Sequence, residues 1–337
     1  MNLKNNKYDY EAIKSTAMNG PRVTTLLKHF EDIAAKQKQF PKAKVVAQHD
    51  FLERDPEYYI YHAIYTKNFG VFNSHGVASM PFVFEQCMRM GITLCRFAEL
   101  NGHSGTDPLT FYGTSTADGT HARTIAEYSE GRIVTLTDSP NKANQKEFYR
   151  HLHHKNSFFH LGSFFDITPD YLVENAPVGF KNKFDFIWEN TTLQMYGNNR
   201  SEQIAYIKRV LKEDGIISFL EKLNHEDSTE YARREKIKDD LFKSKYFTTE
   251  EIQAKRTTIL EEMEKGQLTL SELSSAIKEH FQYAYIVWNS TNFYEIIASN
   301  NKLRIQSFLD LLPDPYVPDA FACERPMVRS LFSKRTS

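Results

Sequence analysis

Cysteine is scarce in the chain, and neither sign of charge predominates. Three cysteines in 337 residues, Cys87, Cys95 and Cys323, are too few and too scattered for a disulfide framework or a zinc-binding pattern. The 42 basic and 43 acidic residues give a net charge of −1, which argues against broad binding of nucleic acid or of anionic membranes. No stretch approaches the roughly 18 uncharged apolar residues of a membrane span, and the polar segment Met1–Tyr10 has no apolar core of an export signal. We therefore expect a cytoplasmic protein with neither a nucleic-acid nor a membrane partner.

Aromatic residues, by contrast, are plentiful. They make up 13% of the chain, and Tyr and Phe are concentrated near positions 57–83 and 281–294. Core packing and a pocket for an apolar or planar ligand both account for this concentration. Apolar residues recur at helical spacing through residues 1–107, except that the Gly, Ser and Asn residues of 68–79 indicate a loop. We interpret residues 1–107 as an N-terminal helical cap.

From Pro108 onward, short β-favouring runs alternate with helical patterns. The five predicted strands are Leu109–Tyr112, Arg132–Asp138, Ser157–Phe165, Phe184–Trp188 and Gly215–Leu220. Strands separated by helices predict a parallel sheet with both faces covered. Near the C-terminus, Tyr283–Trp288 and Phe293–Ala298 predict a hairpin, and Met327–Phe332 is a last short run that would close the sheet. We therefore expect an α/β core in residues 108–225 that is completed by residues 283–337.

Residues 226–282 interrupt this pattern with 23 charged residues in 57. Two capping boxes, Thr248–Glu251 and Thr269–Glu272, open predicted helices. We interpret the segment as a helical insertion with a solvated outer face. Its role is open between a structural excursion, a substrate lid and a homodimer element.

A turn of small residues follows the first predicted strand. Gly113, Ser115, Ala117 and Gly119 separate this strand from the next helix, so a ligand can approach the backbone and the unpaired N–H groups of the helix. Asp138 lies 19 residues after Gly119, at the end of the second strand, where a carboxylate can accept both hydroxyls of a ribose. Together these features predict a nucleotide or nucleoside cradle.

With this arrangement the chain resembles the class I S-adenosylmethionine (SAM)-dependent methyltransferases over residues 108–225 and 283–332. The pieces that carry the resemblance are Gly113–Gly119, Asp138, Leu161–Asp166, Trp188–Asn190 and Val210–Gly215. The resemblance implies a Rossmann-like, mostly parallel seven-stranded sheet whose last strand runs antiparallel, with helices on both faces. It also implies SAM as the cofactor, and an N-terminal helical cap and a helical insertion after strand five that cover the substrate.

The resemblance assigns roles to single residues. Ser115 and Ala117 stand at the first two glycines of the family's motif, and Gly113 stands at its acidic position. Asp118 is our candidate to replace the contact that this acid makes with the methionine amino group. The remaining matches place Ser163 near the adenine amino group and Phe164 against the ring. The predicted cofactor-binding residues are Gly113, Ser115, Ala117, Asp118, Gly119, Asp138, Ser163, Phe164 and Glu189.

A general base is needed only if the methyl acceptor must lose a proton. The candidates are His62, His75, Glu189 and His225. Glu189 follows the fourth strand, at the sheet edge where such folds bind ligands, and a contact with the methionine part of the cofactor is its alternative role. The histidines between His151 and His160 have no carboxylate or Cys at a clear ligand spacing, so we predict no metal site.

The predicted function is in-line methyl transfer from SAM to a small organic acceptor. An aromatic or polyketide-like secondary metabolite is favoured by elimination, and oxygen, nitrogen and carbon acceptors are all compatible with the sequence. One alternative is an NAD(P)-dependent oxidoreductase, which the absent G-x-G-x-x-G spacing weakens. The other is a non-catalytic methyltransferase-like scaffold, which the altered glycine motif supports.

Overall fold

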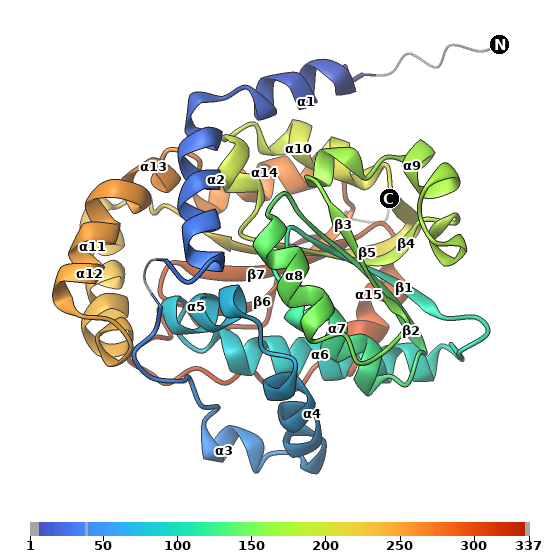
Figure 1. The fold of residues 1–337 in the computed structure, drawn as a ribbon, viewed down its shortest axis with the longest axis horizontal. Coiled ribbons are helices and arrows are strands. Elements are labelled where there is room, and N and C mark those ends of the chain that lie inside the picture. Colours follow the sequence, from blue (N-terminus) through green and yellow to red (C-terminus); the bar gives the residue numbers. More distant parts are fainter. Residues whose placement is uncertain (1–6, 38–39, 334–337) are drawn as a thin grey trace.

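The computed structural model describes residues 7–37 and 40–333, so part of the polar segment Met1–Tyr10 lies outside the described residues. Its centre is one sheet with the strand order β3-β2-β1-β4-β5-β7-β6-β8 (Figure 1). The strands are β1 (Leu109–Thr114), β2 (Ile133–Ser139), β3 (Ser157–Leu161), β4 (Phe184–Asn190), β5 (Leu211–Lys222), β6 (Tyr283–Ser290), β7 (Phe293–Ser299) and β8 (Arg329–Ser333). The predicted α/β class is confirmed.

The sheet is mixed rather than purely parallel. Strands β1 to β5 pair in parallel, whereas β7 lies between β5 and β6 and is antiparallel to both. The predicted hairpin is therefore present as β6 and β7. The expectation of seven strands is wrong, because β8 pairs antiparallel with β6 and adds an eighth.

The third strand is shorter than predicted. It ends at Leu161, and a capping box between Ser163 and Asp166 opens a 3₁₀ turn at Phe164–Asp166. Phe164 and Phe165 are buried in this turn. Their β-favouring side chains therefore satisfy the core, and the backbone turns where the small Gly162 and Ser163 allow it.

Helices cover both faces of the sheet (Figure 1). Those of the core are α7 (Thr120–Tyr128), α8 (Lys142–Arg150), α9 (Pro169–Glu174), α10 (Arg200–Lys208) and α15 (Lys302–Asp310). Successive strand residues enter opposite clusters, as Phe111 and Tyr112 of β1 do, because side chains alternate across a strand. Helices α7 and α15 contribute to the cluster that contains Phe111, and α10 contributes to the one that contains Tyr112.

The N-terminal segment is helical up to the first strand. Its helices are α1 (Tyr10–Met18), α2 (Pro21–Ala34), α3 (His49–Leu52), α4 (Pro56–Lys67), α5 (Val71–Ser79) and α6 (Val83–Leu100). The loop expected over residues 68–79 is thus wrong, since α5 occupies most of it. The N–H of Gly70 donates to Thr120 Oγ1 at 2.9 Å, and the N–H of Asn73 donates to Asp118 Oδ2 at 2.8 Å. This helix is capped by side chains from a distant part of the chain, so its local composition gave no sign of it.

The insertion after β5 is helical, as expected. It contains α11 (Ser228–Ile237), α12 (Thr249–Lys255), α13 (Glu261–Glu264) and α14 (Leu270–Lys278), and both predicted capping boxes are formed. Two π-helical turns, Lys238–Phe242 and Arg256–Leu260, continue α11 and α12. No helix among the described residues combines the length and the apolar character that crossing a membrane requires.

Candidate functional site

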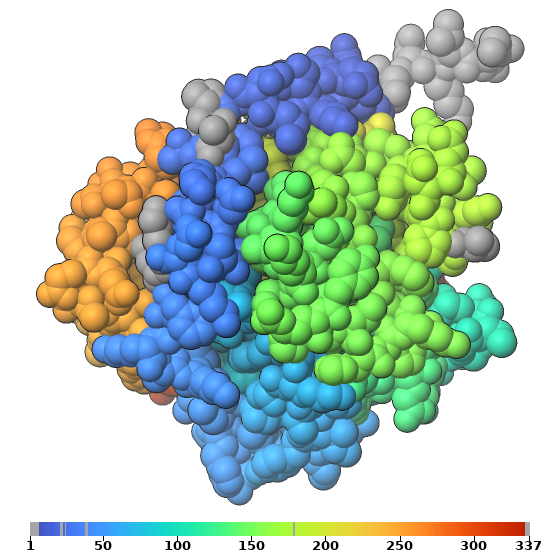
Figure 2. All heavy atoms as spheres, viewed as in Figure 1, coloured from blue at the N-terminus to red at the C-terminus, as the bar shows by residue number. Residues whose placement is uncertain are grey.

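A cavity lies at the C-terminal edge of the parallel strands. Its walls come from the turns after β1, β2 and β4, from α2 and α5, and from β5 and the insertion. Helix α2 forms one side, between α8 and the insertion (Figure 2). On this side, Leu26 of α2 packs against Ile259, Leu260 and Met263 of the insertion. The N-terminal segment and the insertion therefore close the cavity together.

The turn after β1 has a glycine-type backbone although it contains few glycines. Ser115, Ala117 and Gly119 have φ angles of +46°, +54° and +70°. These are the three positions at which the family motif has glycine. A left-handed conformation costs a non-glycine residue about 1 to 2 kcal/mol, so the surrounding structure must hold Ser115 and Ala117 in place. Both line the cavity.

Asp138 makes several of the hydrogen bonds that stabilise this turn. Its Oδ1 accepts from Tyr112 Oη and from the N–H of Ser115, both at 2.7 Å, and its Oδ2 accepts from Ser115 Oγ at 2.9 Å. The side chain is completely buried and burial raises its pKa to about 6. Asp138 is not part of the cavity wall. The structure therefore places it beneath the turn, where it fixes the backbone conformation.

Gly113 and Gly119 are needed because neighbouring side chains leave no room for a Cβ atom. A Cβ on Gly119 would lie 2.7 Å from Phe148 Cδ2 and 2.8 Å from Thr137 Cγ2, and one on Gly113 would lie 2.8 Å from Thr116 Oγ1. Neither glycine lines the cavity. Their small size thus allows α7 and the turn to pack closely against β2.

Asp118 joins the turn to the N-terminal segment. Its Oδ2 accepts from the N–H of Asn73, and its Oδ1 accepts from the N–H of Thr120 at 3.1 Å and from Thr120 Oγ1 at 2.6 Å. The side chain is buried and lies outside the cavity wall. The structure therefore places Asp118 as the cap of α5 rather than as a group that faces a ligand.

Ser163 and Phe164 are buried and are not part of the cavity wall. Ser163 forms the capping box with Asp166, and Phe164 is buried against Phe165 and Tyr196. Of these residues Tyr196 lines the cavity. Sequence reasoning missed it, since it lies in a 3₁₀ turn, Leu193–Tyr196, that has no recognisable motif.

Glu189 ends β4 and holds the turn that follows. Its Oε1 accepts from the N–H groups of Thr192 at 2.5 Å and Leu193 at 3.0 Å. Burial, reinforced by the nearby charge of Glu221, raises the pKa of Glu189 well above its ordinary value. Burial thus disfavours the ionised form that a general base requires, and the two backbone contacts occupy Oε1. Its neighbours Asn190, Thr191 and Thr192 line the cavity.

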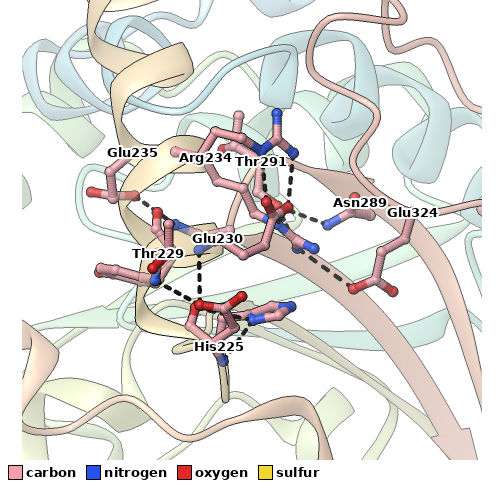
Figure 3. A network of polar contacts seen from close by, with 12 residues as sticks. His225, Thr229, Glu230, Arg234, Glu235, Asn289, Thr291 and Glu324 are labelled. Carbon is pink, nitrogen blue, oxygen red and sulfur yellow. Dashed lines mark hydrogen bonds and ion pairs between the residues drawn. The ribbon is translucent and has the colours of Figure 1, made fainter.

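Of the three predicted histidines, His75 of α5 lies in the cavity wall. His62 packs against Phe84, with ring centroids 5.6 Å apart, and is not part of the wall. His225 precedes α11, where its Nδ1 accepts from the N–H of Asp227 at 3.0 Å (Figure 3). The structure thus separates His62 and His225 from the cavity.

Two buried acceptors in the wall have no hydrogen-bond partner among the described residues. They are Asn144 Oδ1, on α8, and Gln194 Oε1, in the turn after β4. The amide nitrogens of the same side chains do have partners. Asn144 Nδ2 donates to Ser139 Oγ at 3.0 Å, and Gln194 Nε2 donates to the carbonyl of Thr191 at 3.3 Å. A buried unsatisfied acceptor is costly, so these two atoms indicate that a ligand with hydrogen-bond donors belongs here.

Four lysines also line the cavity, and sequence reasoning missed them too. Lys222 ends β5, and Lys238, Lys243 and Lys255 belong to the insertion. All four side chains are buried. We expected a solvated outer face for this charged segment. That face is exposed at Lys236 and Asp240, whereas the buried Lys238 and Lys255 lie at or beside two π-helical turns, which composition does not reveal.

No group of three His, Cys, Asp or Glu side chains in residues 7–37 and 40–333 is arranged to hold a metal ion. His151 follows α8 and lies 3.7 Å from Glu147, and His160 contacts Tyr171 through its Nδ1 at 3.1 Å. The histidines of this region therefore have separate local contacts.

Comparison with known proteins gives remote structural similarities. No protein-family model and no curated protein sequence matches the chain. The plantazolicin methyltransferase BpumL, solved with a triazolic desmethylPZN analog and SAH, is 11% identical, with a TM-score of 0.47 over 87% of this chain and 100% of that one. An O-methyltransferase family protein from Burkholderia thailandensis is 11% identical, with a TM-score of 0.39 over 62% of this chain and 55% of that one. A SAM dependent methyltransferase from Aquifex aeolicus is 12% identical, with a TM-score of 0.37 over 60% and 87%.

The sheet itself agrees with the resemblance found in the sequence. Strands β1 to β5 are parallel, and the antiparallel β7 is inserted between β5 and β6. The chain therefore has a Rossmann-like α/β fold with a mixed sheet.

Proposed function

We propose that the protein is a SAM-dependent methyltransferase that acts on a small organic molecule. The observation that carries the proposal is the turn after β1, where Ser115 and Ala117, two of the three glycine-type positions, line the cavity at the C-terminal edge of the sheet. The strand order reverses between β1 and β4, and open α/β sheets bind their ligands at such a switch point.

The residues of the wall fit this cofactor. The ribose hydroxyls and the methionine ammonium group of SAM are hydrogen-bond donors, and Asn144 Oδ1 and Gln194 Oε1 are buried acceptors without partners. We assign Asn144, after β2, to the ribose and Gln194, after β4, to the amino group. The backbone of Ser115 and Ala117 forms the surface of the cradle. Asp138 acts on the cofactor through this turn, as a positioning residue.

When bound, SAM supplies a methyl group that its sulfonium charge already activates. The chain contributes orientation and the exclusion of water. Leu26, Leu260 and Met263 close the cavity between α2 and the insertion. Phe30 and Phe72, with ring centroids 5.6 Å apart, add an apolar surface on which the body of an organic acceptor can pack.

If the acceptor carries a proton, His75 is our candidate to receive it. It is the predicted base that lies in the wall, and its Nε2 is 2.7 Å from Lys255 Nζ and 3.3 Å from Ser79 Oγ. These contacts fix the orientation of the ring.

Calorimetric titration of the protein with SAM, S-adenosylhomocysteine (SAH) and NADH tests the proposal. We expect binding of the two sulfur nucleosides and none of NADH. Asn144→Ala and Gln194→Ala should each weaken SAH binding about tenfold, because each removes a hydrogen bond worth about 1.4 kcal/mol. Gln306→Ala, in α15 and outside the cavity, is the matched control. Binding of NADH alone would favour the oxidoreductase, and binding of neither would favour the scaffold.

A further inference from the structure

The part of the cavity formed by β5 and the insertion contains an unusual concentration of buried positive charge. Lys222, Lys238 and Lys243 are each 2% exposed, and Lys255 is 7% exposed. Lysine is almost never buried to this extent unless an opposite charge accompanies it. Four buried lysines therefore require acidic partners.

Two buried carboxylates pair with three of the four lysines. Glu235 Oε2 accepts from Lys222 Nζ at 2.9 Å and from Lys238 Nζ at 2.5 Å. Asp239 Oδ1 lies 3.4 Å from Lys243 Nζ and 3.7 Å from Lys238 Nζ. Arg256 also pairs with Asp239, and the partly exposed Glu264 lies 3.9 Å from Lys222. The buried lysines thus exceed the buried acids by two.

Lys255 is the lysine without an acidic partner. Within the described part of the chain, no carboxylate lies within ion-pair distance of its Nζ, which instead contacts His75 Nε2 at 2.7 Å. Burial and the charges of the other lysines lower the pKa of Lys255 well below its ordinary value, and burial lowers those of Lys222 and Lys243 to about 8. The cluster is therefore ready to gain a proton, and with it more positive charge, when an anion enters.

The cluster is held rigidly from behind. Asn292 Nδ2 donates to Glu235 Oε1 at 3.0 Å. Arg234 of α11 donates to the carbonyl of Thr291 at 3.5 Å and lies 3.5 Å from Glu324 (Figure 3). Two π-helical turns, a feature common at functional sites, adjoin Lys238 and Lys255. Uncompensated charge kept in a fixed position is typical of a binding site, because it lowers stability unless a ligand neutralises it.

We propose that Lys222, Lys238, Lys243 and Lys255 bind an anionic group of the methyl acceptor, a carboxylate or a phosphate, an inference that rests on the methyltransferase function proposed above. The acceptor is then an organic acid or a phosphate ester whose apolar body packs on the wall that includes Phe72. The orphaned acceptors are Asn144, in α8 after β2, and Gln194, in the turn after β4, whereas the lysines belong to β5 and the insertion. This separation assigns the lysines to the acceptor and not to the cofactor.

The test titrates the SAH-saturated protein with benzoate, with phenyl phosphate and with the uncharged benzamide. We expect at least one anion to bind ten or more times more tightly than benzamide, and the preferred anion distinguishes a carboxylate from a phosphate. Lys243→Gln and Lys255→Met should each weaken that binding at least tenfold and leave SAH affinity unchanged. Lys236→Gln, an exposed lysine of α11, is the matched control and should leave both affinities unchanged.

The melting temperature without ligand separates binding from a structural role. Lys255→Met removes a buried amino group that has no acidic partner and keeps the length of the side chain, so it should melt at the wild-type temperature or above. A lower melting temperature would assign the cluster to the fold and overturn the proposal, as would equal binding of benzoate, phenyl phosphate and benzamide. A parallel loss of SAH affinity in Lys243→Gln and Lys255→Met would assign the cluster to the cofactor's carboxylate. If the wild type binds the anions but not SAH, the methyltransferase function fails while the anion site stands.

Discussion

Near β1 and β2 the cavity wall consists of backbone and uncharged side chains, whereas near β5 and the insertion it includes four buried lysines. The first region is a strained turn that Asp138 holds through three hydrogen bonds. The second is an excess of charge held by two acids. One cavity therefore combines two kinds of wall. The shaped turn suits a cofactor of fixed structure, and the charged lysines can select among acceptors.

The largest effect that we expect is on the turn region, through substitution of Asp138. Asp138→Ala removes all three hydrogen bonds under the turn and leaves Tyr112 Oη buried without its acceptor. We expect a loss of about 3 kcal/mol in the free energy of unfolding, and loss of SAH binding. Urea denaturation and calorimetry measure the two. An unchanged stability would show that the turn does not depend on Asp138.

Asp138→Asn is the conservative counterpart, because its amide oxygen can accept from Tyr112 and Ser115 while its nitrogen donates to Ser115 Oγ. It also removes a titration. A buried carboxyl with a pKa of about 6 contributes stability that is present below its unfolded-state pKa and is lost as the pH rises through 6. The stability of Asp138→Asn relative to the wild type should therefore rise by about 2 kcal/mol between pH 4.5 and pH 7.5. A pH-independent difference would contradict the raised pKa.

A smaller effect is expected at the joint between the turn and α5. Asp118→Ala removes the cap of α5, which should cost about 1 to 2 kcal/mol and speed amide exchange across residues 71–79. Because α5 carries His75, the contact of His75 with Lys255 is weakened as well. Asp9→Ala, which removes the N-cap of α1, is the matched control and should leave exchange in α5 unchanged. Slow exchange in Asp118→Ala would mean that α5 does not need this cap.

The smallest effect concerns the strain in the turn. Ala117→Gly relieves a φ of +54° and should raise the free energy of unfolding by about 0.5 kcal/mol, after the greater backbone entropy of glycine is subtracted. The same change in a regular helix, Ala122→Gly in α7, should lower it by about 1 kcal/mol. Thermal denaturation compares the two. A destabilising Ala117→Gly would show that the turn is not strained there.

The sequence predicted the elements whose signals are local. Alternating strands and helices, the hairpin and both capping boxes in the insertion each depend on residues close together in the chain. Helix α5 could not be predicted, because its caps come from Asp118 and Thr120. The glycine motif was recognisable because its positions are close together in the sequence. The hydrogen bonds of Asp138 with Tyr112 and Ser115 join distant residues, so the sequence did not reveal them.

The charged wall was beyond local reasoning. Lys238, Lys243 and Lys255 lie in a segment whose composition is typical of a solvated surface. Lys238 and Lys255 lie at or beside π-helical turns, and Lys255 contacts His75 of α5, so their surroundings come from features that local composition does not reveal. Glu189 shows the converse, since its position after β4 indicated a ligand-facing acid while its hydrogen bonds turn it toward the backbone.

The seam between Leu26 and the pair Ile259 and Leu260 joins segments that are more than 200 residues apart. During synthesis the N-terminal helices and strands β1 to β5 emerge first, and Leu26 of α2 lacks its partners Ile259, Leu260 and Met263 until the insertion follows. The cavity is therefore among the last parts of the molecule to assemble. An incomplete or partly folded chain would have no closed site, so ligand binding reports that folding has been completed.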